Sequence, residues 1–137
     1  MHQQLLIEKI SSVLAATDNT YDEKLTQVLD KASRIFVTGA GRSGLVARFF
    51  SMRLMHAGYN VYIVGEIVTP SIQNGDLFIV ITGSGETETM IAYTKRAKAV
   101  GAQIVTISTK SKSTIADMSD LVCQIGNPDQ YAKVVGM

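Results

Sequence analysis

The chain has a single cysteine and almost no net charge, and each scarcity excludes a class of protein. Cys123 has no second cysteine with which to form an internal disulfide and lies in an apolar run. We therefore expect a cytoplasmic protein with a buried, inert thiol rather than a reactive one. A formal charge of +1 without a basic stripe gives no electrostatic basis for binding nucleic acid or an anionic membrane. No apolar stretch approaches the roughly 20 residues that span a bilayer, and the N-terminus does not read as a signal peptide.

Apolar residues are plentiful by contrast. They make up 46% of a chain of 137 residues, which is the length of one domain and enough to build a core. The helical pattern over residues 43–57 is apolar almost all round, whereas a helix that covers a sheet usually has a polar outer stripe. Burial in the core accounts for one face of this helix, and a subunit interface best accounts for the other. We therefore expect a homo-oligomer.

Short apolar runs alternate with helical patterns along the chain. Two helices are predicted within the first 32 residues, the second beginning at a capping box formed by Thr20 and Glu23. The connection over residues 65–75 contains Pro70 and a turn signal at Asn74-Gly75, and gives only weak support to a helix. Strands are predicted at 34–38, 60–64, 76–82, 103–108 and 121–125, with helices at 44–57, 87–100 and 113–118. Such alternation indicates an α/β domain with a parallel sheet.

Two glycine-rich loops follow the first and third predicted strands. GAGRSG at 39–44 matches the G-x-G-x-x-G spacing of a dinucleotide-binding loop, which is a weak signal alone. TGSGET at 82–87 is the second loop. In a doubly wound five-stranded sheet of flavodoxin-like order 2-1-3-4-5, strands 1 and 3 are neighbours and both loops meet at one crevice. In the dinucleotide-binding order the third strand is remote from the first, so we predict the 2-1-3-4-5 order.

The second loop has the chemistry of a site for a terminal phosphate. Its glycines bring backbone N–H groups close to a ligand, and the helix that follows adds unpaired N–H donors and a positive dipole end. Hydroxyl groups on Thr82, Ser84 and Thr87 add further donors, and Ser43 can reach in from the first loop. Arg42 could neutralise charge or contact a sugar hydroxyl. The alternative is that Ser43 and Thr87 merely cap helices.

These loops resemble those of the sugar isomerase (SIS) domain family, which binds phosphosugars. TGSGETET is similar to the family's S-x-S-G-E-T phosphate loop, with threonine at position 82 where serine is more common, and GAGRSG is similar to its first loop. The resemblance covers nearly the whole chain, residues 1–137, as a single SIS domain with a helical N-terminal segment at 1–32. The substrate-binding residues it implies are Gly41, Arg42, Ser43, Thr82, Gly83, Ser84, Gly85, Glu86 and Thr87.

Within the family, the stretches TGAGRSGLVARFFSMRLMHAGYNVYIVGE, TPSIQNGDLFIVITGSGETET and AKAVGAQIVTIST are most similar to 6-phospho-3-hexuloisomerases. That resemblance implies interconversion of 3-hexulose 6-phosphate and fructose 6-phosphate in the ribulose monophosphate route of formaldehyde fixation. It also implies no cofactor, no metal and a tetramer. Relatives continue past YAKVVGM with a C-terminal segment that carries the glutamate usually assigned as proton acceptor. We therefore expect that base to lie beyond Met137.

Moving a carbonyl from C3 to C2 needs a general base and a donor for the developing oxyanion. Glu66, just beyond the second strand, is a candidate base, with an ordinary solvated or ion-paired role as the alternative. Glu86 is expected to brace the N-terminus of its own helix. His56 lies too far down its helix to reach its own subunit's phosphate loop. It either completes a neighbour's site or ends its helix as an ordinary residue, and we keep it as a catalytic candidate.

Two rival functions remain open at this point. One is a non-catalytic SIS module that senses a phosphosugar, although the first 30 residues contain no basic recognition helix for DNA. The other is an NAD-binding domain, which the second loop and the short chain both disfavour.

Overall fold

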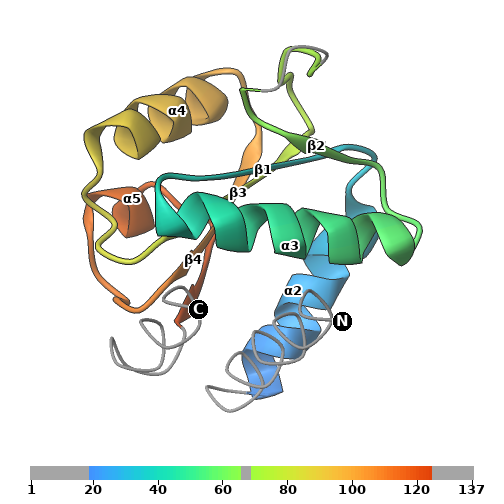
Figure 1. Cartoon of the computed structure of the whole chain (residues 1–137), viewed down its shortest axis with the longest axis horizontal. Helices are drawn as coiled ribbons and strands as arrows, with labels where there is room; N and C mark the ends of the chain where they lie inside the picture. The colour runs from blue at the N-terminus through green and yellow to red at the C-terminus, as the bar shows by residue number, and fades with distance from the viewer. Residues whose placement is uncertain (1–18, 66–68, 125–137) are drawn as a thin grey trace.

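The computed structural model describes residues 19–65 and 69–124, which form five strands and four helices arranged around one sheet (Figure 1). The first of the two helices predicted within residues 1–32 lies outside the described residues. In chain order the elements are α2 (Asn19–Lys31), β1 (Ile35–Gly39), α3 (Arg42–His56), β2 (Val61–Ile63), β3 (Leu77–Thr82), α4 (Glu88–Ala99), β4 (Gln103–Ser108), α5 (Thr114–Asp117) and β5 (Leu121–Gln124).

The five strands form one parallel sheet in the order β2-β1-β3-β4-β5, which confirms the predicted topology. β1 and β3 are neighbours in register, with Ile35 opposite Leu77 and Gly39 opposite Ile81. All six residues of β3 are buried. Continuous burial of this kind requires a run of apolar residues without alternation, because both faces of a central parallel strand are covered by helices. The sequence pattern LFIVIT supplies that run.

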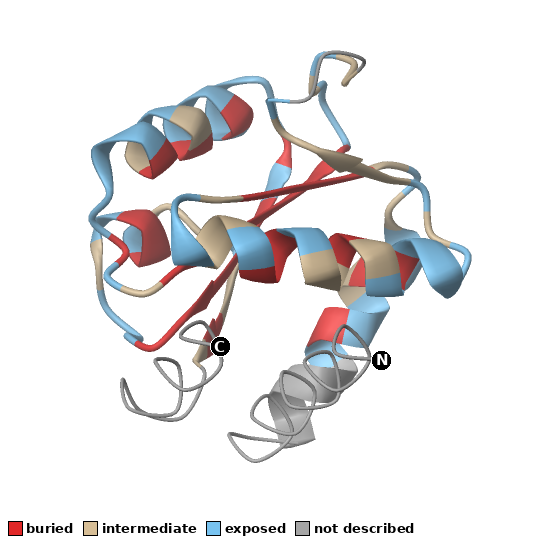
Figure 2. Ribbon diagram, in the orientation of Figure 1, coloured by how far each residue is buried: buried red, intermediate tan, exposed pale blue. Residues whose placement is uncertain are grey.

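The sheet separates two cores. On one face, α2 and α3 pack their apolar side chains, including Leu29 and Leu54, against Val37 and Ile79. On the other face, α4 and α5 pack against the intervening strand residues, such as Phe36 and Val80. Figure 2 shows the buried strands between helices whose outer surfaces are exposed. Alternate residues of each central strand therefore pack against helices on opposite faces of the sheet. This packing fixes the ends of β1 and β3, where the two loops begin.

The connection between β2 and β3 contains no helix over its described residues, 64–65 and 69–76. Hydrogen bonds hold it instead. Thr69 Oγ1 donates to the carbonyl of Ile63 at 2.7 Å, and Arg34 donates from Nε to Asp76 Oδ1 at 3.0 Å. The turn predicted at Asn74-Gly75 is present, with Gly75 at a φ of 87°. β2 is shorter than predicted, at three residues.

The helix α3 has one buried and one exposed apolar face. Val46, Ala47 and Leu54 are buried against the sheet. Leu45 and Met55 are each 57% exposed, which is unusual for large apolar side chains. Phe50 packs partly buried against the core, so it does not belong to the exposed face. Within the described part of the chain, no helix is long and apolar enough to cross a membrane.

Candidate phosphate-binding site

The two glycine-rich loops leave the carboxyl ends of the neighbouring strands β1 and β3. The last residue of β1, Gly39, is in register with Ile81, one residue before β3 ends at Thr82. Both loops therefore begin at the same edge of the sheet, as the sequence predicts. Each loop leads directly into a helix, α3 or α4, whose N-terminus offers backbone N–H groups and a positive dipole end at that edge.

Glycine is required in the first loop because the strand end and the first turn of α3 are in close contact. A Cβ atom on Gly39 would lie 2.5 Å from the carbonyl oxygen of Ser43, and one on Gly44 would lie 2.9 Å from the carbonyl oxygen of Gly39. Gly41 is the N-cap of α3 and has a φ of 58°. Ser43 is half-buried in the first turn, and Arg42 is exposed. Because the N-cap is Gly41, the alternative that Ser43 caps this helix is wrong.

In the second loop, side-chain oxygens hold the backbone from within. Thr82 is buried and its Oγ1 accepts a hydrogen bond from the backbone N–H of Gly85 at 3.0 Å. Ser84 is exposed, and its Oγ accepts from the backbone N–H of Glu86, also at 3.0 Å. Since Ser84 Oγ uses a lone pair as acceptor, its O–H remains available to donate to a ligand. Thr82 thus shapes the loop, while Ser84 faces outward.

Thr87 is the N-cap of α4, yet its side chain makes no capping hydrogen bond. A threonine at this position usually accepts from a backbone N–H of the first turn. Thr87 is exposed, so its hydroxyl can contact a ligand at the start of the helix. Thr87 thus occupies the N-cap position of α4, as the alternative expects, but without a capping side-chain hydrogen bond. Its place in the substrate site stays a prediction.

Glu86 does not brace its own helix, contrary to expectation. Its carboxylate instead accepts hydrogen bonds from the backbone N–H of Thr114 at 2.8 Å and from Thr114 Oγ1 at 2.5 Å. These two bonds, together with the nearby charge of Lys110, hold the pKa of Glu86 below its ordinary value. The sequence could not reveal this, because Thr114 lies 28 residues away and only the sheet order brings it near.

Of the two candidate catalytic residues, the structure describes only His56, and it does not bring His56 to the loops of its own subunit. His56 is exposed at the last position of α3, while the phosphate loop lies beside its first turn. Fourteen residue steps at 1.5 Å each put about 20 Å between the two helix ends. Glu66 lies outside the described residues. Among the described residues, no group of three or more His, Cys, Asp or Glu side chains could hold a metal ion.

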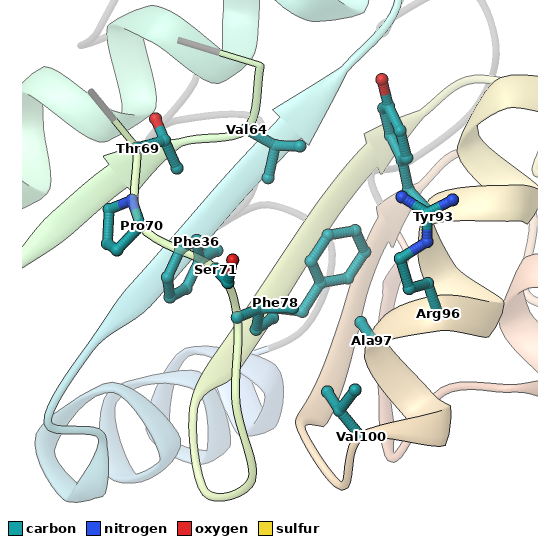
Figure 3. Close-up of a pocket in the computed structure, with 11 residues that line it drawn as sticks. Phe36, Val64, Thr69, Pro70, Ser71, Phe78, Tyr93, Arg96, Ala97 and Val100 are labelled. Atoms are coloured by element: carbon teal, nitrogen blue, oxygen red, sulfur yellow. The ribbon is translucent and has the colours of Figure 1, made fainter. Parts of the chain in front are cut away.

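Two cavities flank this arrangement. One, of about 250 Å³, adjoins the first loop and is lined by residues that include Thr38, Gly41 and Arg48. The larger, of about 360 Å³, lies between the C-terminal half of α4, with Arg96 and Val100, and the connection at residues 69–72 (Figure 3). The larger cavity is mostly apolar and does not contain the loop hydroxyls of Ser84 and Thr87. We therefore place the candidate site at the loops.

Comparison with known proteins decides the family. The model of the SIS domain matches residues 28–136. The chain belongs to the SIS domain family. This assignment agrees with the sheet order and with the position of the second loop, and it removes the reason to treat GAGRSG as a dinucleotide-binding loop.

Several curated relatives are named 3-hexulose-6-phosphate isomerase. The chain is 53% identical over 131 residues to a 3-hexulose-6-phosphate isomerase of Methylomonas aminofaciens, covering 96% of this chain and 72% of that protein. It is 37% identical to the 3-hexulose-6-phosphate isomerase of Bacillus subtilis over 90% of this chain and 67% of that protein. The curated relatives are longer, since this chain spans between 54% and 72% of their lengths. These relatives support a phosphosugar isomerase activity.

A solved structure supports the same family and fold. A protein of Methanococcus jannaschii, whose crystal structure was described as inferring a function of 3-hexulose-6-phosphate isomerase, is 30% identical and superposes with a TM-score of 0.79. The match covers 96% of this chain and 81% of that one. The doubly wound sheet of this chain is therefore the fold of its SIS relatives.

Proposed function

We propose that this chain interconverts 3-hexulose 6-phosphate and fructose 6-phosphate in the cytoplasm, as a step of formaldehyde fixation by the ribulose monophosphate route. One observation in the structure carries the binding half of the proposal. The hydroxyls of Ser84 and Thr87 stand at the N-terminus of α4, and neither caps that helix. Two outward donors beside a positive helix end suit a dianionic phosphate, and the names of the relatives support the reaction.

The reaction exchanges a carbonyl and a hydroxyl between neighbouring carbons. A base removes the proton from C2 of the 3-hexulose, the electron pair forms the C2–C3 double bond, and the carbonyl oxygen at C3 becomes the enediolate oxygen. The O2 proton then passes to O3, which becomes the C3 hydroxyl, and the base returns its proton to C3 as the C2–O2 carbonyl of fructose 6-phosphate forms. Atoms and charge balance without an external oxidant, so general acid–base groups and an oxyanion donor suffice.

We propose three candidates for the general base. Glu66 follows β2 in the sequence, and it lies outside the described residues. His56 ends α3 and would serve the site of a neighbouring subunit. The resemblance places the usual glutamate of the family beyond Met137. An assay of these candidates is best made on a chain extended to the length of its relatives.

The assembly proposed for this activity is a homotetramer with the exposed face of α3 at an interface. Leu45 and Met55 on that face are the exposed apolar side chains that a partner would cover. If His56 acts across this interface, one helix serves two sites, with its first turn in one subunit and its last in the next. Mixing His56→Ala chains with Ser84→Ala/Thr87→Ala chains should then restore part of the activity in exchanged oligomers.

Hydrogen exchange into the product tests the proposed reaction directly. Fructose 6-phosphate incubated in D₂O with the protein should lose the proton signal of C3, because the reverse reaction removes that proton and returns deuterium. Ser84→Ala/Thr87→Ala is the matched control and should slow the exchange strongly. A protein that binds fructose 6-phosphate but exchanges no C3 proton, even at the length of its relatives, would be a phosphosugar sensor instead.

A further inference from the structure

Glu86 connects the phosphate loop to the segment that precedes α5. Its two carboxylate oxygens accept hydrogen bonds from the backbone N–H and the hydroxyl of Thr114. Its own backbone N–H donates to Ser84 Oγ at 3.0 Å. Glu86 therefore links Ser84 in the phosphate loop to Thr114, in the connection that follows β4.

Other contacts join the same two segments. The carbonyl of Gly85 accepts from the N–H of Ile115 at 3.2 Å, and the carbonyl of Gly83 accepts from Thr109 Oγ1 at 2.8 Å. Gly83, Gly85 and Glu86 thus all bond to residues 109–115, behind the loop. Within the described residues, the side chains of Ser84 and Thr87 make no hydrogen bond to residues 109–115, and both residues are exposed. The loop backbone is thus held by residues 109–115 while its two exposed hydroxyls are not used in that contact.

The negative charge of Glu86 bears on whether this residue can contact a phosphosugar. Glu86 carries a negative charge within a few residues of the proposed phosphate position, and like charges close together repel each other. The two donors of Thr114 hold this carboxylate in the segment behind the loop. Lys110 provides the positive charge on that side. Glu86 is therefore poorly suited to contact a phosphosugar and well suited to hold the loop.

We propose that Glu86 and Thr114 form a latch that positions the phosphate loop, with Glu86 acting on the substrate only through Ser84 and the loop backbone. The proposal rests on the proposed phosphate-binding function. It replaces the sequence-based expectation that Glu86 is itself a substrate ligand, and it adds Thr114 as a positioning residue.

The substitution Thr114→Pro distinguishes a positioning role of Glu86 from direct contact of Glu86 with the ligand. Thr114 is the first residue of α5, where proline is well tolerated, and the preceding Ser113 has an extended backbone (φ −170°, ψ 172°) of the kind that precedes proline. Thr114→Pro removes both donors to Glu86 without removing the carboxylate. Thr114→Val removes the hydroxyl alone, and Thr114→Ser keeps both donors as the conservative control.

The binding experiment measures the Kd of inorganic phosphate and of fructose 6-phosphate by calorimetry for Glu86→Ala, Thr114→Pro and the double variant. We expect each single variant to weaken both ligands about tenfold, on the scale of one lost hydrogen bond to a charged group. The double variant should be no weaker than the weaker single, because both remove the same interaction. Thr114→Ser should bind both ligands as the wild type does. In Glu86→Ala and Thr114→Pro, KM should rise while kcat changes little. A further loss from Glu86→Ala in the Thr114→Pro background would show direct contact with the ligand and overturn the latch.

A second measurement needs no ligand. Amide hydrogen exchange should be slow at Gly85 and Glu86 in the wild type, since their N–H groups donate to Thr82 and Ser84. Exchange at both should accelerate in Thr114→Pro and Glu86→Ala by more than the loss of global stability, measured by urea unfolding, accounts for. Unchanged exchange would overturn the latch. Accelerated exchange with a phosphate affinity that does not depend on Ser84 and Thr87 would support the latch and refute the proposed phosphate site instead.

Discussion

Gly85 and Ser113 are in contact across the two segments that build the site: a Cβ atom on Gly85 would lie 2.1 Å from Ser113 Oγ. That same oxygen accepts from the backbone N–H of Ala116 at 3.0 Å and caps α5. Gly85 also has a φ of 72°, in the left-handed region that other residues avoid. Any side chain at this position must therefore strain the backbone and displace a helix cap at once.

Gly85→Ala should lower both stability and phosphate affinity. The left-handed backbone costs a non-glycine residue about 1–2 kcal/mol, and loss of the Ser113 cap about 1 kcal/mol more. Gly75→Ala is the matched control, because Gly75 has a φ of 87° but no atom within 4 Å of its Cβ position. It should lose stability and keep phosphate binding. Urea unfolding and calorimetry measure the two effects, and a Gly85→Ala protein that binds phosphate normally would contradict the site.

Ser84→Ala/Thr87→Ala should weaken phosphate binding while the fold survives. Each hydroxyl is expected to contribute a hydrogen bond to a charged group, worth about 1.5–3 kcal/mol. Thr89→Ala is the control, since Thr89 is exposed one residue into α4. Calorimetric titration with fructose 6-phosphate compares the three proteins. Equal affinities in all three would remove these hydroxyls from the site.

The stabilising effect of Glu86 should disappear in acid. Hydrogen bonds from Thr114 lower the pKa of Glu86 in the folded protein, so folding favours its ionised form. That contribution is fully present above the ordinary carboxyl pKa and is lost as the pH falls through the lowered folded value. The difference in unfolding free energy between the wild type and Glu86→Gln should shrink over that acidic range. A difference that is constant between pH 7 and pH 3 would contradict this.

Asp76→Ala should destabilise the fold by about 1.5–3 kcal/mol, the scale of a hydrogen bond to a charged group. Asp76 is 4% exposed, and it accepts from Arg34 and from the backbone N–H of Gln73 at 2.7 Å. Its removal leaves both donors without this acceptor. Asp30→Ala is the control, because Asp30 is exposed and accepts from Tyr59 Oη alone among the described contacts. Urea unfolding near neutral pH should separate the two, and equal losses would refute the stronger role of Asp76.

Met55→Lys should dissociate the proposed oligomer without unfolding the subunit. Met55 is 57% exposed on α3, so a charge there meets water in the monomer and an apolar partner in the assembly. Phe50→Lys is a poorer test, because Phe50 packs against the core. Val100→Lys, at a 38% exposed position beside α4, is the matched control. Light scattering should show a smaller mass for Met55→Lys alone. A wild type that is monomeric at micromolar concentration would contradict the assembly.

The sequence predicted the sheet order because that order depends on local signals: buried apolar runs such as 77–82 and the two loops that need a common crevice. The steric restriction on Gly39 and Gly44 is local, since the atoms that a Cβ would meet belong to residues 39–44, whereas the restriction on Gly85 comes from Ser113. It failed at Glu86 because the preference for a carboxylate at a helix N-terminus is a local rule, whereas Thr114 is brought near by the pairing of β3 with β4. Nor does sequence spacing tell whether Thr87 caps its helix, since that depends on its side-chain rotamer.

The three-residue strand β2 limits strand pairing with another chain at one border of the sheet. It forms one border of the sheet and pairs only with Ile35, Phe36 and Val37 of β1. A border strand exposes unpaired N–H and C=O groups to which another chain can add by strand pairing, and a short one offers few of them. The carbonyl of Ile63 is moreover occupied by Thr69. At this border the fold therefore offers few backbone groups to which another strand could add.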